Sequence, residues 1–345
     1  MRRVGLLLAV FALGGCDALF NGATLVDACK PGDGVICNLD RAEDIEIVPG
    51  TRWLMISELG TPPKAGHVSI VDPITKERRA ISDTATVAET ETFPRCGGPP
   101  KELHPRGFNL SVAEDGSGRL YQINQTRVER YRVVTEGDDV SLIWEGCVSI
   151  PKEVMANDVA SLGDKGFVVS HMADRERDTI SNFQLAAFGS GTGGAYRWTR
   201  DGGWARIPGV KAAFGNGIQV DPKTGRIYLS SMFAQRILGF DLDGGNLTST
   251  DRNINQVDNL SWSPDGRLIG VGHTGVGIYG TSACKVGAVC SFPFAVTAID
   301  PKTMKVETIF ESKSGIPGAS TAILKDGMLY FGSSFGDRVT IAKAK

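Results

Sequence analysis

Short apolar runs separated by turn-forming residues dominate the chain from about residue 29 to residue 345. They form a recurring unit in which an apolar strand is followed by a polar turn and by a partner strand with alternating positions. Six leading strands are expected, at residues 53–56, 119–123, 166–169, 226–229, 267–271 and 328–331. Partner strands are expected at residues 67–72, 127–134, 237–241 and 295–300.

The spacing of these units indicates the fold. Turns such as Asp-Pro-Lys-Thr at residues 221–224 and 300–303 separate them, with residue types that favour tight reversals. Six units over residues 29–345 average about 53 residues each, close to the roughly 50 of a kelch-type blade. We therefore expect an all-β protein with a six-bladed β-propeller domain over residues 29–345, in which radial closure removes long exposed edges.

Two further points concern this assignment. A pair of β-sandwiches is the competing fold, but the middle of the chain has no linker rich in Pro, Gly and Ser. No segment shows a sustained 3.6-residue period, which argues against helical solenoids and αβ folds. The final strand, at residues 338–342, is expected to complete the first blade if the chain termini meet in one sheet.

The N-terminal residues have the pattern of an export signal. Met1, Arg2 and Arg3 precede an apolar stretch that ends at Leu13 and is too short to span a bilayer. The following Gly-Gly-Cys resembles the lipobox of bacterial lipoproteins, which implies lipidation of Cys16. We expect a signal peptide at residues 1–15, a lipidated tether at 16–28, and a lipid-anchored protein of the bacterial cell envelope that faces the periplasm or the exterior.

Composition bears on disulfides and on partners. Without Cys16, six cysteines remain, and an even number in an oxidising compartment favours disulfides. Fifteen pairings are possible. Short separations favour Cys29 with Cys37 and Cys284 with Cys290, which leaves Cys96 for Cys147. The net charge of −2 argues against a nucleic-acid partner.

Several carboxylate and amide residues stand beside strand starts, where the central channel of a propeller would lie. They are Glu43, Asp44, Asn157, Asp158, Asn216, Asp258 and Asn259. Hard oxygen donors of this kind suit Ca²⁺ better than Zn²⁺. Since neighbouring residues of a strand point to opposite sides, Glu43 and Asn157 would face one ion while Asp44 and Asp158 face another. Taken singly, each pair is better explained by ordinary turn chemistry than by an ion site.

Five motifs in order resemble the paraoxonase/arylesterase family, which is related to gluconolactonases and strictosidine-synthase-like proteins. They are residues 43–47 (Glu-Asp-Ile-Glu-Ile), 104–108 (His-Pro-Arg-Gly-Phe), 157–159 (Asn-Asp-Val), 214–218 (Phe-Gly-Asn-Gly-Ile) and 257–261 (Val-Asp-Asn-Leu-Ser). The resemblance implies a six-bladed propeller with two calcium ions in its tunnel. Glu43, Asn157, Asn216, Asp258 and Asn259 match the ligands of the catalytic calcium, and Asp44, Asp158 and the Phe108 carbonyl match those of the structural calcium.

The resemblance also implies calcium-dependent hydrolysis of lactones or aryl esters, with a small-molecule substrate. This chain has Arg106 and Gln125 where the family has a histidine dyad, and a permanently charged arginine cannot accept a proton. Arg106 is instead expected to bind substrate, as a partner for a carboxylate or phosphate. His273 matches a histidine of the family's pocket, and His171 begins a top-face loop, so each is a candidate base.

The remaining candidates leave alternatives open. Water activation by a ligand carboxylate, Glu43 or Asp258, resembles the gluconolactonases. His67 and His104 are expected to be structural. The long stretch between Met172 and Ala195 is interpreted as a substrate lid. The second functional hypothesis is a non-catalytic, calcium-stabilised propeller that binds a ligand or protein, which the missing histidine dyad favours.

Overall fold

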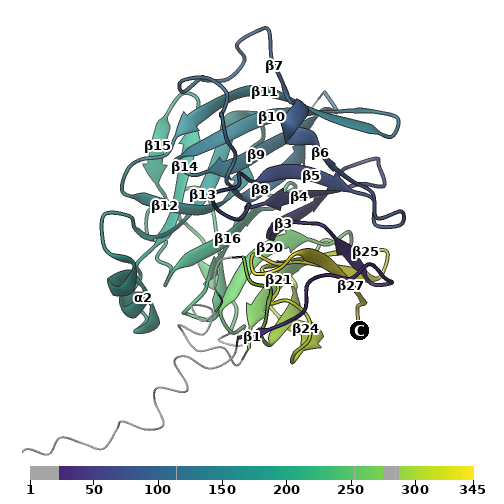
Figure 1. The fold of residues 1–345 in the computed structure, drawn as a ribbon. Helices are drawn as coiled ribbons and strands as arrows, with labels where there is room; N and C mark the ends of the chain where they lie inside the picture. The colour runs from purple at the N-terminus through teal and green to yellow at the C-terminus, as the bar shows by residue number, and fades with distance from the viewer. Residues whose placement is uncertain (1–22, 114, 252–253, 275–283, 285–286) are drawn as a thin grey trace, which may run out of the picture.

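Six β-sheets arranged around a common centre form the body of the protein (Figure 1). The computed structural model describes residues 23–113, 115–251, 254–274, 284 and 287–345. The expected signal peptide, and Cys16 with its lipidation, lie outside the described residues. The innermost strands contact one another in the ring order β3, β8, β12, β16, β20, β25 and back to β3. The six-bladed β-propeller expected from the sequence is therefore confirmed.

Each blade is an antiparallel sheet in which the first strand lies next to the axis. The first two blades comprise β3 (Ala42–Ile47), β4 (Leu54–Glu58), β5 (His67–Val71) and β6 (Arg78–Ala80), then β8 (Pro105–Val112), β9 (Gly118–Asn124), β10 (Arg127–Glu136) and β11 (Asp139–Ser149), with β7 (Thr86–Val87) added parallel to β11. The next two comprise β12 (Val154–Ser161), β13 (Gly166–Asp174), β14 (Gly194–Thr199) and β15 (Gly203–Arg206), then β16 (Gly215–Val220), β17 (Ile227–Ser231), β18 (Arg236–Phe240) and β19 (Thr248–Ser249).

The last two blades complete the ring. They comprise β20 (Val257–Trp262), β21 (Leu268–His273), β23 (Phe294–Ile299) and β24 (Val306–Ser312), then β25 (Thr321–Lys325), β26 (Met328–Gly332), β27 (Arg338–Lys343) and β2 (Val35–Cys37). A separate pair consists of β1 (Thr24–Leu25) and β22 (Cys290–Ser291). Every expected leading strand corresponds to the second strand of a blade, from β4 to β26.

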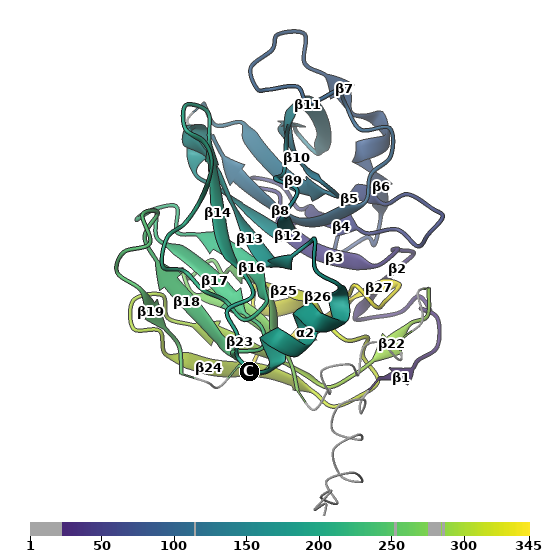
Figure 2. The same ribbon diagram turned by 90° about the vertical axis from the view of Figure 1, so that its left-hand side faces the viewer.

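Closure of the ring differs from the expectation. The strand at residues 338–342 does not complete the first blade, because β27 pairs with β26 in its own blade. The outer strand of that last blade is β2, whose Ile36 lies opposite Val339 (Figure 2). The sheet is thus closed by a strand from near the start of the chain, which is too short to stand out in the sequence.

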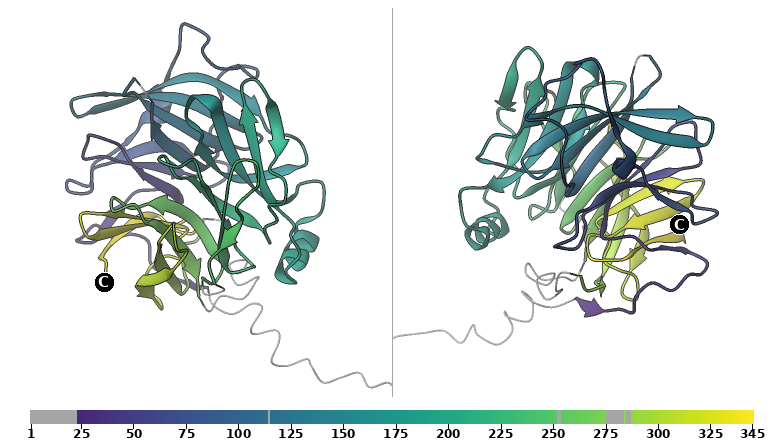
Figure 3. Two further views of the ribbon diagram at one scale, coloured as in Figure 1. Left: turned by 180° about the vertical axis from the view of Figure 1, so that it is seen from behind. Right: turned by 45° about the horizontal axis from the view of Figure 1, so that its top comes forward.

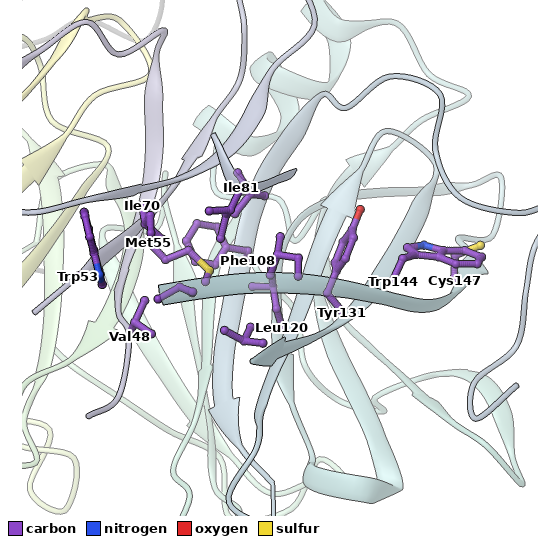
Figure 4. Close-up of a cluster of buried hydrophobic side chains, with 14 residues drawn as sticks. Val48, Trp53, Met55, Ile70, Ile81, Phe108, Leu120, Tyr131, Trp144 and Cys147 are labelled. Carbon is purple, nitrogen blue, oxygen red and sulfur yellow. The ribbon is translucent and has the colours of Figure 1, made fainter. Parts of the chain in front are cut away.

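The core lies between neighbouring blades. Figure 4 shows the cluster between the first two, where Trp53 and Met55 of one blade pack near Phe108 and Leu120 of the other. All four side chains are fully buried. Burial of one such side chain contributes about 1.5–3 kcal/mol, so these contacts between blades stabilise the ring.

Three disulfides are present, with the pairing that the cysteine spacing favoured. Cys29 bonds to Cys37, Cys96 to Cys147 and Cys284 to Cys290. The first ties the segment before β2 to the end of β2, and the second ties a loop to the outer strand of the second blade. Both disulfides link parts of the chain that lie away from the inner strands.

One α-helix of the described residues, α2 (Thr179–Ala187), stands apart from the sheets (Figure 3). It falls within the stretch interpreted as a lid. The Asp178 carboxylate caps it by accepting from the Ser181 amide at 2.9 Å, and Asn182 Nδ2 donates to the Asp174 carbonyl at 2.8 Å. These bonds tie the helix to the end of β13. None of the helices in the described ranges is long and apolar enough to cross a membrane.

Candidate metal and substrate site

The inner strands of five blades are irregular at the residues that the sequence singled out. The register of β3 against β4 shifts between Ala42 and Asp44, and β8 shifts between Pro105 and Phe108. The same break occurs in the next three inner strands, at residues 156–159, 215–218 and 257–260. A β-bulge leaves residues unpaired in the ladder and redirects their side chains. Each break therefore frees polar residues to face the axis.

Several of these residues line one large cavity. Its volume is about 830 Å³. Seven of the expected site residues line it, namely Glu43, Asn157, Asn216 and Asp258 of the metal set, Arg106 and Gln125 of the substrate set, and the candidate base His273. His171, Asp44, Asp158, Asn259 and Phe108 are not among the lining residues.

Four side-chain oxygens of the expected catalytic-calcium set are buried without a hydrogen-bond partner among the described residues. They are Glu43 Oε2, Asn157 Oδ1, Asn216 Oδ1 and Asn259 Oδ1. Buried oxygens are normally hydrogen-bonded, and orphaned ones require an explanation such as an ion. Within the described ranges, no three His, Cys, Asp or Glu side chains form a metal cluster. Three of the four orphaned oxygens belong to asparagine amides, which are not among these four residue types.

Hydrogen bonds hold two of these oxygen-bearing side chains, Glu43 and Asn259, in place. Asn259 Nδ2 donates to the Glu43 main-chain carbonyl at 3.1 Å and to Glu43 Oε1 at 3.3 Å. Ser320 Oγ donates to the same main-chain carbonyl at 2.9 Å. The other carboxylate oxygen of Glu43, Oε2, and the amide oxygen of Asn259, Oδ1, remain available, so the site has hard oxygen ligands already in position.

A second pair of carboxylates is buried and does not line the cavity. Asp44 Oδ2 accepts from the Phe108 amide at 3.2 Å and links the first blade to the second. Asp158 Oδ2 accepts from the Ile218 amide at 2.7 Å and links the third blade to the fourth. Both side chains are buried. They join neighbouring inner strands, as a structural site on the axis would require.

These carboxylates are close enough to repel one another. Burial raises the pKa of Asp44 well above its usual range, and the charge of Asp158 adds to the effect. Burial likewise raises the pKa of Asp158, against the hydrogen bond from Ile218. It raises the pKa of Glu43 to about 7 and that of Glu46 to about 8. Acidic groups packed this way favour protons or a cation.

Glycine permits the close approach of inner strands around the axis. A Cβ atom at Gly107 would lie 2.3 Å from Asp158 Oδ1. At Gly217 it would lie 2.7 Å from Asn259 Cα. Distances under about 3 Å are steric clashes, so both motifs depend on glycine at these positions.

Four residues that line the cavity have a left-handed backbone conformation. Arg41, Gln125, Phe214 and Gln256 all have left-handed φ values, of 63°, 55°, 63° and 38°, and all line the cavity. Residues other than glycine rarely adopt this backbone conformation, and where they do it is often at a functional site.

His273 lies beside the proposed ligands. Its Nε2 atom is 2.9 Å from the Ala319 carbonyl and 3.7 Å from Asp258 Oδ2. A carbonyl only accepts, so Nε2 carries the proton, and the lone pair is on Nδ1, which has no partner among the described residues. Burial lowers the pKa of His273 to about 4. The neutral ring thus has a free acceptor nitrogen.

His171 is placed differently. The ring packs edge-on against Tyr196, with centroids 5.4 Å apart, and its neighbour Met172 lines the cavity instead. Burial, with the charge of Arg206, lowers its pKa to about 4. Because successive residues of a strand face opposite sides, Met172 and His171 cannot both face the cavity.

Sequence reasoning missed several cavity residues. His104, expected to be structural, lines the cavity, whereas His67 pairs with Asp83 at 2.7 Å on the exterior. Arg41 and Arg175 also line it. His104 lies just before β8, in the same motif as Arg106, and this closeness in the sequence was the available signal. Arg41 and Arg175 had no comparable signal.

The comparisons with known proteins concern the fold. No protein-family model matches this chain, and no curated protein matches it. Solved structures with a similar fold include the luciferin-regenerating enzyme, at 14% identity over 90% of this chain and 94% of that chain with a TM-score of 0.52. A gluconolactonase from Xanthomonas campestris is 13% identical over 94% of this chain and 95% of that one, also with a TM-score of 0.52.

A third similar structure has no assigned function. It is a protein from Bacteroides thetaiotaomicron, 10% identical over 94% of this chain and 76% of that chain, with a TM-score of 0.55. At identities this low, the similarity shows a shared fold. It does not show that this chain acts on the substrate of any of these proteins.

Proposed function

We propose that this protein is a lipid-anchored, calcium-dependent hydrolase of lactones or aryl esters. One observation carries the proposal: three of the four orphaned, buried oxygens of the expected ligand set, those of Glu43, Asn157 and Asn216, belong to residues that line a cavity of about 830 Å³. A channel of this kind, with a few convergent polar groups, is the usual form of a small-molecule site. The gluconolactonase among the similar folds is a further, weaker support.

Two cations complete the proposed site. Glu43, Asn157, Asn216, Asp258 and Asn259 would hold the catalytic Ca²⁺, and Asp44, Asp158 and the Phe108 carbonyl would hold a structural one. A bound Ca²⁺ with an open coordination position supplies Lewis-acid stabilisation of charge on a carbonyl oxygen.

The chain itself supplies the proton acceptor and the binding groups. In the proposal, His273 accepts a proton from water at Nδ1, while its Nε2–H remains bonded to the Ala319 carbonyl. Arg106 and Gln125 bind and orient the substrate on another wall. Glu43 or Asp258 is the alternative acceptor, and His171 is a weaker candidate because its ring does not line the cavity.

The decisive experiment is a panel of aryl esters and lactones, assayed on the mature protein in Ca²⁺ and in excess chelator. We expect hydrolysis in Ca²⁺ and its loss in chelator. Asn216→Ala should lower turnover while the protein remains folded, since the Asn216 side chain is at the site and outside the apolar core clusters. Full activity in excess chelator would remove calcium from the mechanism.

A second function has one specific observation in its favour. Neither Arg106 nor Gln125 can serve as a general base, although both line the cavity. A calcium-stabilised propeller that binds a ligand without hydrolysing it would keep the cation sites and show no turnover in the same panel.

A further inference from the structure

Three arginines line the cavity from three blades. Arg41 precedes β3, Arg106 lies in β8, and Arg175 follows β13. Arg41 donates to the carbonyls of Ser334 and Gly60, at 2.9 and 3.2 Å, and Arg175 donates to the Gln125 carbonyl at 3.5 Å. Within the described ranges, none of the three lies within ion-pair distance of a carboxylate, and the Arg106 guanidinium donates no hydrogen bond to another described residue. Their charges are available to a ligand.

The cavity also contains carboxylates. Glu43 and Asp258 are the carboxylates of this cavity, and a divalent cation held by them would balance their charge. The Asp40 carboxylate offsets part of the charge of Arg41. The guanidinium charges of Arg106 and Arg175 remain, and an anionic ligand would balance them.

Another part of the lining is apolar. It consists of thioether and aromatic side chains, namely Met155, Met172, Phe183, Phe214, Met232 and Phe233. The rings of Phe183 and Phe214 stack with centroids 4.9 Å apart, and Phe233 meets Phe214 edge-on at 5.6 Å. Phe183 belongs to α2, so the helix forms part of this lining. Such a surface binds an acyl chain or an aryl ring, and thioethers adapt to its shape.

We infer that the preferred substrates are amphipathic esters or lactones that carry a carboxylate, which Arg106 binds with Arg41 and Arg175 while the Met and Phe side chains bind the apolar part. This inference rests on the proposed hydrolase function. A carboxylate presents two coplanar oxygens that match the planar guanidinium, so Arg106 selects by geometry as well as by charge.

A matched pair of esters tests the selectivity. The charged substrate is the mono-p-nitrophenyl ester of glutaric acid, and the neutral one is p-nitrophenyl pentanoate, which has the same chain length. We expect kcat/KM to be higher for the charged ester, and Arg106→Gln to reduce the ratio of the two values by about 10-fold or more. Arg132→Gln is the control, because Arg132 lies 3.8 Å from Glu145 and does not line this cavity. Its ratio should equal that of the wild type.

A binding measurement separates this inference from the hydrolase proposal. Calorimetry with phenylbutyrate and phenylbutyramide, in Ca²⁺, should show binding of the acid and weak binding of the amide. Arg106→Gln should remove the difference. Carboxylate-selective binding without hydrolysis of any ester would overturn the enzyme proposal and keep the selectivity. Hydrolysis of both esters with equal kcat/KM, together with equal binding of acid and amide, would overturn the selectivity and keep the enzyme.

Discussion

The side-chain amide of Asn259 donates to Glu43 Oε1 at 3.3 Å, although the two residues are 216 positions apart in the chain. The bond joins β20, the inner strand of the fifth blade, to β3, the inner strand of the first. The sixth blade lies between these two in the ring. It uses one oxygen of the carboxylate and the nitrogen of the amide, and leaves Glu43 Oε2 and Asn259 Oδ1 for a ligand. The geometry of the candidate site is therefore set by contacts between blades.

Calcium should stabilise the fold. We expect two bound ions per chain by elemental analysis and a higher melting temperature in millimolar Ca²⁺ than in chelator. At a free concentration one hundred times Kd, one site contributes about 2.7 kcal/mol. Calorimetry measures the shift, with Mg²⁺ as the control because that ion requires a smaller, octahedral site. No bound metal and equal melting temperatures would contradict both ion assignments.

Asp158→Asn should have opposite effects in the two conditions. In Ca²⁺ it weakens the structural site, so the melting temperature should fall, by the equivalent of about 2–4 kcal/mol. In chelator it removes the repulsion between Asp158 and Asp44 and should raise the melting temperature. Thermal unfolding of both proteins in both conditions checks this. A change of the same sign in both would show that Asp158 is not a cation ligand.

The chelated protein should lose stability as pH rises. Burial raises the pKa of Glu43 to about 7 and that of Glu46 to about 8, above the 4.5 of an ordinary glutamate. Between the ordinary pKa of 4.5 and the raised pKa of each group, the folded state binds more protons than the unfolded state. The unfolding free energy therefore falls as pH increases through this range. Urea titrations in chelator, from pH 5 to pH 8.5, measure the slope. Ca²⁺ should flatten it, and a rise in stability over this range would contradict the assignment.

His273→Gln should lower kcat, with a smaller effect on KM. Loss of a general base typically costs about 100- to 10,000-fold. Glutamine retains a donor for the Ala319 carbonyl, so the fold should tolerate the change. Esterase kinetics test this, with His67→Gln as the control because His67 pairs with Asp83 on the exterior. Unchanged kcat in His273→Gln would transfer the role to Glu43 or Asp258.

Closure of the ring predicts a large cost for truncating Ile36. This side chain is fully buried on β2, opposite Val339 of β27. Ile36→Ala should reduce the unfolding free energy by about 2–5 kcal/mol. Ile74→Ala is the matched control, since Ile74 is 81% exposed. Equal urea midpoints for the two variants would show that β2 contributes little to the last blade.

Much of the fold could be predicted because apolar runs and turn residues are local signals. The strands now named β4, β9, β13, β17, β21 and β26 were visible in that pattern. The three residues of β2 were not, because their assignment depends on pairing with a strand about 300 residues away. Helix α2 was missed since its sequence lacks a long amphipathic period, and its position depends on caps and on contacts with β13.

The candidate site was predictable to a similar degree. The motifs identified Glu43, Asn157, Asn216 and Asp258, which do line one cavity. The breaks in strand register that free these residues leave no mark in the residue pattern. Arg41 and Arg175 were missed because their place at the cavity depends on how separate blades converge. His104 was expected to be structural, although it stands in the same motif as Arg106.

The pairing of β2 with β27 has a consequence for biosynthesis. Residues 35–37 are made early, yet their hydrogen-bonding partner is made after almost all of the other strands. An incomplete chain therefore keeps an unpaired edge at each end of its row of blades, where another chain could add. Complete release of the last strand converts this open row into a ring, so the final step of folding waits for the whole polypeptide.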